Sequence, residues 1–102
     1  MTSEVSLDRA LHAIADPTRR RILQVLKEGG TEAKGAGKKF APCLCGGDIE
    51  ERIRLSQPTI SHHMSILTRA GLVEAAKEGQ WRWYRRNEKA IRQVVRSLRG
   101  KL

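Results

Sequence analysis

Residues 49–71 read IEERIRLSQPTISHHMSILTRAG, a stretch that predicts two helices joined by a tight turn. In the second helix, Ile60, Met64 and Leu67 recur at i, i+4 and i+7, so they share one face and are expected to be buried. Ser56 suits the N-cap of this helix, because a serine hydroxyl can accept a hydrogen bond from the free amides of the first turn. The pattern therefore predicts a second helix with one apolar face.

The first helix of this pair is expected from about Asp48 to Arg54, with Ile49 and Ile53 buried. Leu55, in the turn, is expected to hold the two helices together, and Gly71 suits a left-handed C-cap at the end of the second helix. Two amphipathic helices joined in this way are typical of a helix-turn-helix.

The opposite face of the second helix carries short hydrogen-bonding side chains. They are Ser56, Gln57, Thr59, Ser61, His62 and Ser65. Short donors and acceptors at the N-terminal end of a helix are suited to reading base edges in the major groove, and we interpret these six residues as DNA-binding candidates. His63 borders the apolar face and is expected to be structural.

Residues 72–86 predict a β-hairpin, with its turn at residues 77–80. Lys77, Gln80 and Arg82 are expected near the tip of this wing, where they would contact phosphates or enter the minor groove. The aromatic residues of the returning strand fit two interpretations. We favour packing of the hairpin onto the helices; the alternative is a base-stacking platform for single strands.

Amphipathic helices are also predicted at both ends of the chain, over residues 5–15 and 88–99. Their apolar stripes consist of Leu7, Ala10, Leu11 and Ile14, and of Ile91, Val94, Val95 and Leu98. In so small a domain these stripes lack an obvious intramolecular partner, which predicts that the two helices form a dimer interface. The alternative is that the last helix folds back on its own core.

Between these regions, Asp16 and Pro17 predict the start of another helix, with residues 19–21 (three arginines) in its first turns. These arginines suit contacts with a phosphate or an acidic neighbour, or a solvated basic face. Residues 31–46 are rich in Gly, Ala and Lys at their start and are expected to form a mobile loop.

Three stretches resemble the ArsR/SmtB type of bacterial winged-helix repressor. They are DPTRRRILQVL (16–26), LSQPTISHHMSILTRAGLV (55–73) and EGQWRWYRRN (78–87). The resemblance covers about Leu7 to Leu98. It implies a mainly α winged helix-turn-helix fold with a β-hairpin wing, in the order ααααββα, and a symmetric homodimer. It also implies a repressor of its own or a neighbouring operon that binds double-stranded DNA and is often relieved by a metal ion or another chemical signal.

Cys43 and Cys45 match in type the first two positions of a CxC motif through which several members of that family sense arsenite or soft metals. Two thiolates can bind such an ion given a third ligand, and cysteine pairs can also respond to oxidants. This chain has Asp48 where a third Cys is expected, and Gly46 and Gly47 are expected to separate the pair from the helix. The alternative is therefore a DNA-binding repressor with no metal inducer, controlled by a partner or by its expression level.

The composition fits this interpretation and argues against other classes of protein. The chain has 102 residues, which predicts a single domain over 1–102, and a net charge of +9, which favours a polyanionic partner such as nucleic acid. The sequence has no run of 18 apolar residues and no signal-peptide pattern, so we expect no membrane association and a cytoplasmic location. The sequence has no nucleophile and base at a spacing typical of an active site, so we do not expect an enzyme.

Overall fold

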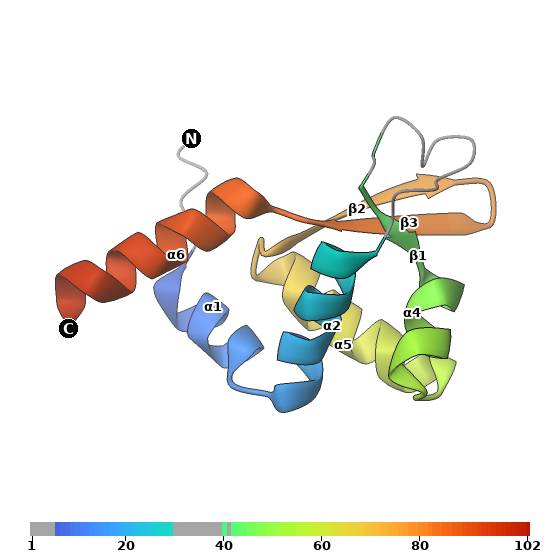
Figure 1. The fold of residues 1–102 in the computed structure, drawn as a ribbon, viewed down its shortest axis with the longest axis horizontal. Coiled ribbons are helices and arrows are strands. Elements are labelled where there is room, and N and C mark those ends of the chain that lie inside the picture. Colours follow the sequence, from blue (N-terminus) through green and yellow to red (C-terminus); the bar gives the residue numbers. More distant parts are fainter. Residues whose placement is uncertain (1–5, 30–39, 41) are drawn as a thin grey trace.

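The computed structural model describes residues 6–29, 40 and 42–102 (Figure 1). Within them, five helices accompany a three-stranded antiparallel sheet. The elements run in the order α1 (Leu7–Ile14), α2 (Pro17–Glu28), β1 (Leu44–Cys45), α4 (Gly46–Ile53), α5 (Gln57–Arg69), β2 (Val73–Glu78), β3 (Trp81–Arg86) and α6 (Glu88–Lys101). The predicted winged helix-turn-helix class is confirmed, and β1 is an addition to it. In Figure 1 the hairpin and α6 point to opposite ends of the molecule.

The helix-turn-helix consists of α4 and α5. Arg54 ends α4 in the left-handed region at φ 64°, which turns the chain sharply toward α5. Ile49 and Ile53 are buried as expected. Leu55 is 38% exposed and does not belong to the buried core, so its role in holding the helices together stays a prediction. The buried isoleucines place α4 against the core.

The end of α5 follows the sequence prediction. Gly71 adopts φ 79°, and the backbone N–H groups of Gly71 and Leu72 donate to the carbonyls of Thr68 and Leu67. This pair of hydrogen bonds is a Schellman motif, which needs a residue with positive φ and therefore favours glycine. The motif directs the chain out of the helix and into β2.

The wing is a hairpin in which Glu78 pairs with Trp81, leaving Gly79 and Gln80 as a two-residue turn. Gly79 has φ 59°, as expected at the first central position of a type II′ turn. The third strand, β1, pairs antiparallel with β3, so the sheet order is β1-β3-β2. The wing is therefore joined by backbone hydrogen bonds to the segment that leads into α4.

The prediction of a mobile loop over residues 31–46 is wrong at its C-terminal end. Leu44 and Cys45 form β1, and α4 begins at Gly46 and not near Asp48. Gly46 and Gly47 belong to the first turn of that helix and do not separate it from the cysteines. Residues 31–39 and 41 lie outside the described residues. The loop prediction overlooked β1 because a two-residue strand has no periodicity of its own.

Two of the three consecutive arginines donate hydrogen bonds to backbone carbonyls at the end of α1. Arg19 is only 7% exposed; its Nε donates to the Ala13 carbonyl (2.7 Å) and its Nη2 to the His12 carbonyl (3.1 Å). Arg20 Nη1 donates to the Ile14 carbonyl at 2.6 Å. The carbonyls of a last helical turn lack partners within the helix and carry partial negative charge, which explains this arrangement. The expectations of a phosphate contact or a solvated face are therefore wrong for Arg19.

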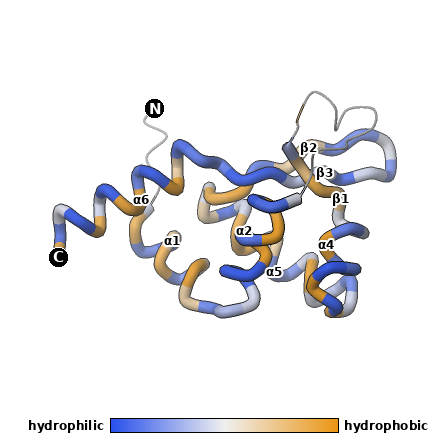
Figure 2. Tube along the Cα trace, in the orientation of Figure 1, coloured by the Kyte–Doolittle hydropathy of each residue, from blue (hydrophilic) through white to orange (hydrophobic). Residues whose placement is uncertain are grey.

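The hydrophobic core lies where α2, α4, α5 and the sheet meet (Figure 2). Its largest fully buried side chains include Ile22, Ile49, Met64, Leu67 and Leu72. This single core supports both the helix-turn-helix and the wing, so the two keep a fixed relation. None of the described helices has the length and the apolar character needed to cross a membrane.

The terminal helices are partly integrated with this core. The first, α1, buries Ala10 and Ala13, and α6 buries Ala90 and Val94. The alternative that the last helix folds onto its own chain is therefore correct for one side of α6. The other side remains open, since Val95 is 56% exposed. The helix also runs to Lys101, one half-turn beyond the predicted end.

Candidate nucleic-acid interface

The outward face of α5 is polar and accessible along its N-terminal half. Five of the six candidates on this helix are exposed and Ser65 is half-buried. The exposed ones are Ser56, Gln57, Thr59, Ser61 and His62. Ser56 occupies the N-cap, but its hydroxyl pairs with the Thr59 hydroxyl at 2.9 Å and not with a backbone amide. The first-turn amides of α5 consequently stay available to an incoming acceptor.

His63, in the middle of α5, connects this helix to the N-terminal helices through Arg19. Arg19 Nη1 and His63 Nδ1 lie 3.2 Å apart, so a neutral imidazole can accept from the guanidinium. Burial lowers the pKa of His63, although the nearby Asp16 carboxylate opposes this. The pKa of Asp16 is itself lowered, chiefly by the hydrogen bond that its carboxylate accepts from the Arg19 amide (3.0 Å). The structural role expected for His63 is consistent with these contacts.

The wing presents its polar residues beside α5. Lys77, Gln80 and Arg82 are all exposed. Of the strand aromatics, Tyr84 packs into the core as expected, whereas Trp81 is 54% exposed and stacks on Trp83 with their ring centroids 6.1 Å apart. The expectation that the aromatics pack onto the helices is therefore wrong for Trp81.

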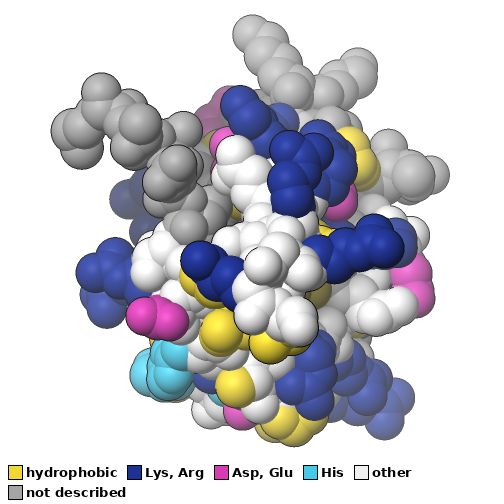
Figure 3. All heavy atoms as spheres, turned by 90° about the vertical axis from the view of Figure 1, so that its left-hand side faces the viewer, with side chains coloured by type: hydrophobic (Ala, Val, Ile, Leu, Met, Phe, Trp, Pro, Cys, Tyr) yellow, Lys and Arg dark blue, Asp and Glu magenta, His cyan; other side chains and the backbone are white. Residues whose placement is uncertain are grey.

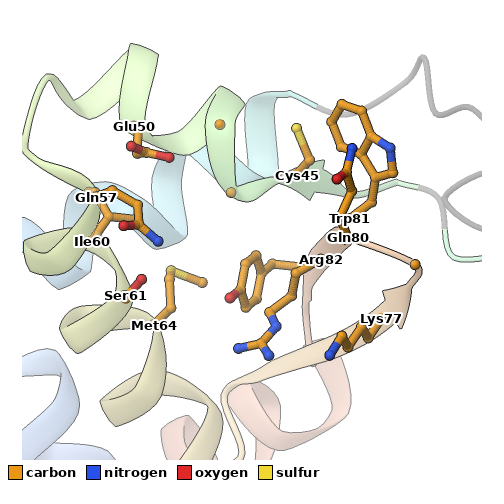
Figure 4. Close-up of a pocket in the computed structure, with 14 residues that line it drawn as sticks. Cys45, Glu50, Gln57, Ile60, Ser61, Met64, Lys77, Gln80, Trp81 and Arg82 are labelled. Atoms are coloured by element: carbon orange, nitrogen blue, oxygen red, sulfur yellow. The ribbon is translucent and has the colours of Figure 1, made fainter.

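A cavity of about 560 Å³ separates α5 from the wing (Figure 4). Five of the nine DNA-binding candidates line it, namely Gln57, Ser61, Lys77, Gln80 and Arg82. The fold thus brings together residues that are more than 15 positions apart in sequence. Sequence reasoning did not place the other lining residues, such as Glu50, Met64 and Trp81, in one site, because only the packing of the hairpin against the helices makes the hollow.

The two cysteines lie in and beside β1 and not in a loop. Cys43 is 1% and Cys45 is 7% exposed, and Cys45 pairs with Trp83 in the sheet. Burial raises the pKa of both thiols; the Arg85 guanidinium offsets this only in part at Cys43, as the backbone amide of Asp48 does at Cys45. Both are therefore expected to be protonated at neutral pH, and a protonated thiol is a poor ligand and nucleophile.

Arg85 joins the outer side of the sheet to Phe40. Its guanidinium lies 3.9 Å from the centroid of the Phe40 ring and its Nε donates to Glu74 at 3.1 Å. In the part of the chain that the structure describes, no three His, Cys, Asp or Glu side chains come together in a way that could hold a metal ion. The cysteine pair thus lacks a third ligand among these residues.

Comparison with known proteins gives the same family from two directions. A family described as "Bacterial regulatory protein, arsR family" matches residues 41–75. An uncharacterized HTH-type transcriptional regulator of Methanocaldococcus jannaschii is 37% identical over 84 residues, which cover 82% of this chain and 81% of that protein. The chain belongs to the arsR family of bacterial regulatory proteins.

Two further proteins are similar to this arsR-family regulator, one in sequence and one in structure. The arsenical resistance operon repressor of Staphylococcus aureus is 32% identical, covering 90% of this chain and 76% of that protein. The homodimeric winged helix-turn-helix DNA-binding domain of a possible ArsR-family regulator from Mycobacterium bovis aligns with a TM-score of 0.67 at 24% identity. That alignment covers 93% of this chain and 77% of the other, and it shows a shared fold. The chain is thus a transcriptional regulator and not an enzyme.

Proposed function

We propose that this arsR-family regulator is a dimeric repressor that binds an imperfect palindrome in double-stranded DNA, upstream of its own or a neighbouring operon. The observation that carries the proposal is the exposed polar face of α5. Gln57 and Ser61, one turn apart, would read base edges together with Thr59 and His62, while Ser56 and Ser65 approach the strands from the two ends of the face.

The wing would provide the contacts that do not depend on sequence. Lys77 and Arg82 would bind phosphates, and Gln80 at the turn would enter the minor groove or bind the sugar–phosphate backbone. A net charge of +9 favours the approach of DNA through long-range attraction. Binding would therefore combine a few base contacts with many electrostatic ones.

Dimerisation would use the open sides of α1 and α6. Leu11, Val95 and Leu102 are exposed, and Leu7, Ile91 and Leu98 are only partly buried. Figure 3 views this end of the molecule, where hydrophobic side chains gather among Lys and Arg. Exposed apolar groups on two adjacent helices favour association with a second copy. The Mycobacterium bovis domain of the same fold is described as homodimeric, which supports a dimer.

Symmetry then constrains the operator. Two copies of α5 in successive major grooves would lie about 34–36 Å apart, so the two half-sites should be about one helical turn apart from centre to centre. A dimer bound there would exclude RNA polymerase from an overlapping promoter. The cytoplasm, where a bacterial chromosome lies, is the expected compartment.

Fluorescence anisotropy on the DNA upstream of its own gene tests this proposal. We expect tight binding whose logarithm falls linearly with the logarithm of salt concentration, by about a thousandfold between roughly 50 and 200 mM salt if six phosphates are engaged. An unlabelled duplex of the same sequence should compete, and the corresponding single strand should not. A salt-independent affinity would count against a duplex-binding repressor. Equal competition by the single strand would favour base stacking on Trp81 instead.

A second candidate adds a thiophilic signal, arsenite or a soft metal ion or an oxidant, at Cys43 and Cys45. The arsenical resistance repressor among the relatives and the CxC motif favour it. Deep burial, the raised pKa of both thiols and the lack of a third ligand among the described residues oppose it. On balance the residues present fit a complete thiolate site poorly, so control by a partner or by expression level remains the alternative.

The double substitution Cys43→Ser with Cys45→Ser separates these two forms of the proposal. The double variant and wild type should both bind the operator, since both thiols are buried and neither is among the DNA-binding candidates. If arsenite or peroxide releases wild type but not the double variant, the thiols are the sensor. If the two proteins respond alike, or neither responds, the repressor is not controlled through this pair.

A further inference from the structure

The cavity between α5 and the wing, called here the wing cavity, has the size of a small-molecule site. Its volume of about 560 Å³ falls within the range of about 300–1,000 Å³ usual for ligand pockets. Three elements form its walls: the first turns of α4, one side of α5, and the β2–β3 hairpin (Figure 4). The described part of the chain thus encloses a hollow at the junction of its two DNA-contacting parts.

The inner wall of the wing cavity is apolar. Ile60, Met64 and Tyr84 line it and are all buried, and Trp81 adds an exposed indole at its rim. Figure 4 shows Ile60 and Met64 on the same side of the hollow as Gln57 and Ser61, all carried by α5. Apolar and aromatic walls with a few polar groups are typical of sites for small organic ligands. A ligand with a flat apolar body would cover the exposed indole of Trp81, since Ile60, Met64 and Tyr84 are already nearly excluded from water.

The charged groups of the wing cavity lie on opposite sides. Lys77 and Arg82 come from the wing, whereas Glu50 comes from α4 on the far side of the hollow (Figure 4). Two cations on one side favour a carboxylate there. A carboxylate on the other side favours a hydrogen-bond donor such as a hydroxyl or an amine. A DNA backbone fits less well, because every phosphate placed near Glu50 would be repelled.

We propose that the wing cavity binds a small aromatic carboxylate with a hydroxyl or amine at its far end, and that this ligand releases the protein from DNA. The carboxylate pairs with Lys77 and Arg82, the ring packs on Trp81 beside Tyr84, and the donor reaches Glu50. The bound acid occupies cations needed for phosphates and therefore competes with DNA. The release from DNA rests on the proposed function. The binding of the acid in the wing cavity does not depend on DNA binding and can be tested without DNA.

The binding test uses 4-hydroxyphenylacetate as the probe, with its neutral amide and tyramine as matched compounds. Trp83→Phe leaves Trp81 as the reporter in the cavity, and Trp81→Phe leaves a reporter that does not line it. We expect saturable quenching of Trp81 by the acid and at least about tenfold weaker binding of the amide and of tyramine. Absence of saturation up to about 10 mM acid, or equal binding of the three compounds, overturns the proposal.

Two variants locate the site. A Cβ at Gly46 would lie 4.0 Å from Tyr84 Cε2, an ordinary contact, so the backbone there accepts a side chain, and Gly46→Leu directs that side chain toward the hollow. We expect this variant, checked for folding by circular dichroism, to bind the acid at least about tenfold more weakly. Glu50→Ala should abolish the preference for 4-hydroxyphenylacetate over phenylacetate. Unchanged acid binding in Gly46→Leu, measured by calorimetry, would place the ligand elsewhere and overturn the proposal.

The last experiment tests whether the acid bound in the wing cavity weakens operator binding. At about ten times its own dissociation constant, a competing acid should weaken operator binding by about elevenfold. The operator affinity of Gly46→Leu is measured first without acid, and adding the acid should then not change it. If the acid binds the cavity but the operator affinity does not change, the regulatory part is wrong. If the protein binds no DNA, the calorimetry still decides whether the cavity is a ligand site.

Discussion

Arg19 joins three helices with one side chain. It is buried, donates to two carbonyls at the end of α1, and lies within hydrogen-bonding distance of His63 on α5. The charge is accommodated because α1 ends there with its partial negative charge. Removal of the guanidinium would leave carbonyls without partners in a closed site, and such groups are costly.

We expect Arg19→Met to lower the free energy of unfolding by about 2–3 kcal/mol, since hydrogen bonds to a charged group contribute about 1.5–3 kcal/mol. In a domain of this size the loss corresponds to a melting temperature lower by roughly 10–20 °C. Arg21→Met, an exposed neighbour on the same helix, is the matched control and should change stability by less than about 0.5 kcal/mol. Equal effects of both substitutions would show that Arg19 is not a structural residue.

His63 should make stability depend on pH. Its pKa is lowered by burial in the folded protein, so below the ordinary histidine pKa of about 6.5 the unfolded chain binds more protons. The contribution of neutral His63 to the free energy of unfolding is therefore fully present above that pH. It is lost as the pH falls through the lowered pKa of the folded state. Urea unfolding at several pH values between 5 and 8 should show stability rising with pH, and His63→Gln should flatten this rise. His62→Gln, an exposed neighbour, should retain the wild-type slope.

At the scale of elements, α5 and the wing should differ in how they contribute to DNA binding. A base-reading residue contributes to affinity for the correct sequence, whereas a phosphate-binding residue contributes to affinity for any sequence and to its salt dependence. The structure allows this division because Gln57 lies on the helix and Lys77 on the hairpin, on two walls of one hollow.

We expect Gln57→Ala to weaken operator binding by about 1–3 kcal/mol without changing the slope of affinity against salt. Lys77→Ala should weaken binding to specific and random duplexes alike and reduce that slope by about 1. Anisotropy titrations of both variants on both duplexes at four salt concentrations make the comparison. A Gln57→Ala protein that lost affinity equally for random DNA would be making backbone contacts only.

The elements differ in how well the sequence predicts them. The buried stripe of Ile60, Met64 and Leu67 and the positive φ of Gly71 follow from local pattern, and both are as expected. These features depend on residues within a few positions of one another, which a sequence displays directly.

Features that depend on distant parts of the chain were not predictable in the same way. The strand β1 is too short to show alternation, and its pairing with β3 spans some 40 residues. Arg19 is buried because the end of α1 happens to face it, which no property of the tripeptide at residues 19–21 reveals. The wing cavity depends on how the hairpin packs against α5, so residue type suggested five of its polar lining residues as DNA contacts but not that they enclose a hollow.

At the scale of the whole molecule, α1 and α6 leave apolar groups open at the end opposite the wing. If a second copy covers them, Val95 should lie in the interface. Val95→Glu should raise the dimer dissociation constant at least about tenfold, because a buried unpaired carboxylate is strongly disfavoured. It should also weaken operator binding, since a monomer reaches one half-site only. Sedimentation velocity and anisotropy on the same samples measure the two effects.

Gln93→Glu provides the control for this substitution, because it places the same charge on an exposed position of the same helix. It should leave both the dimer and the operator affinity close to wild type. Equal dissociation of the two variants would indicate a general effect of charge on α6, and a Val95→Glu protein that remains dimeric would place the interface elsewhere.

The pairing of β1 with β3 also bears on how such a domain can be rebuilt. Because Leu44 and Cys45 supply one edge of the sheet, the hairpin is not a self-contained module that can be exchanged between relatives by cutting at its two ends. A transplanted β2–β3 hairpin would lose its own β1 and would have to pair with the corresponding strand of the other protein. The natural unit of exchange is discontinuous, and a chimaera intended to change operator preference should carry residues 43–47 together with residues 72–86.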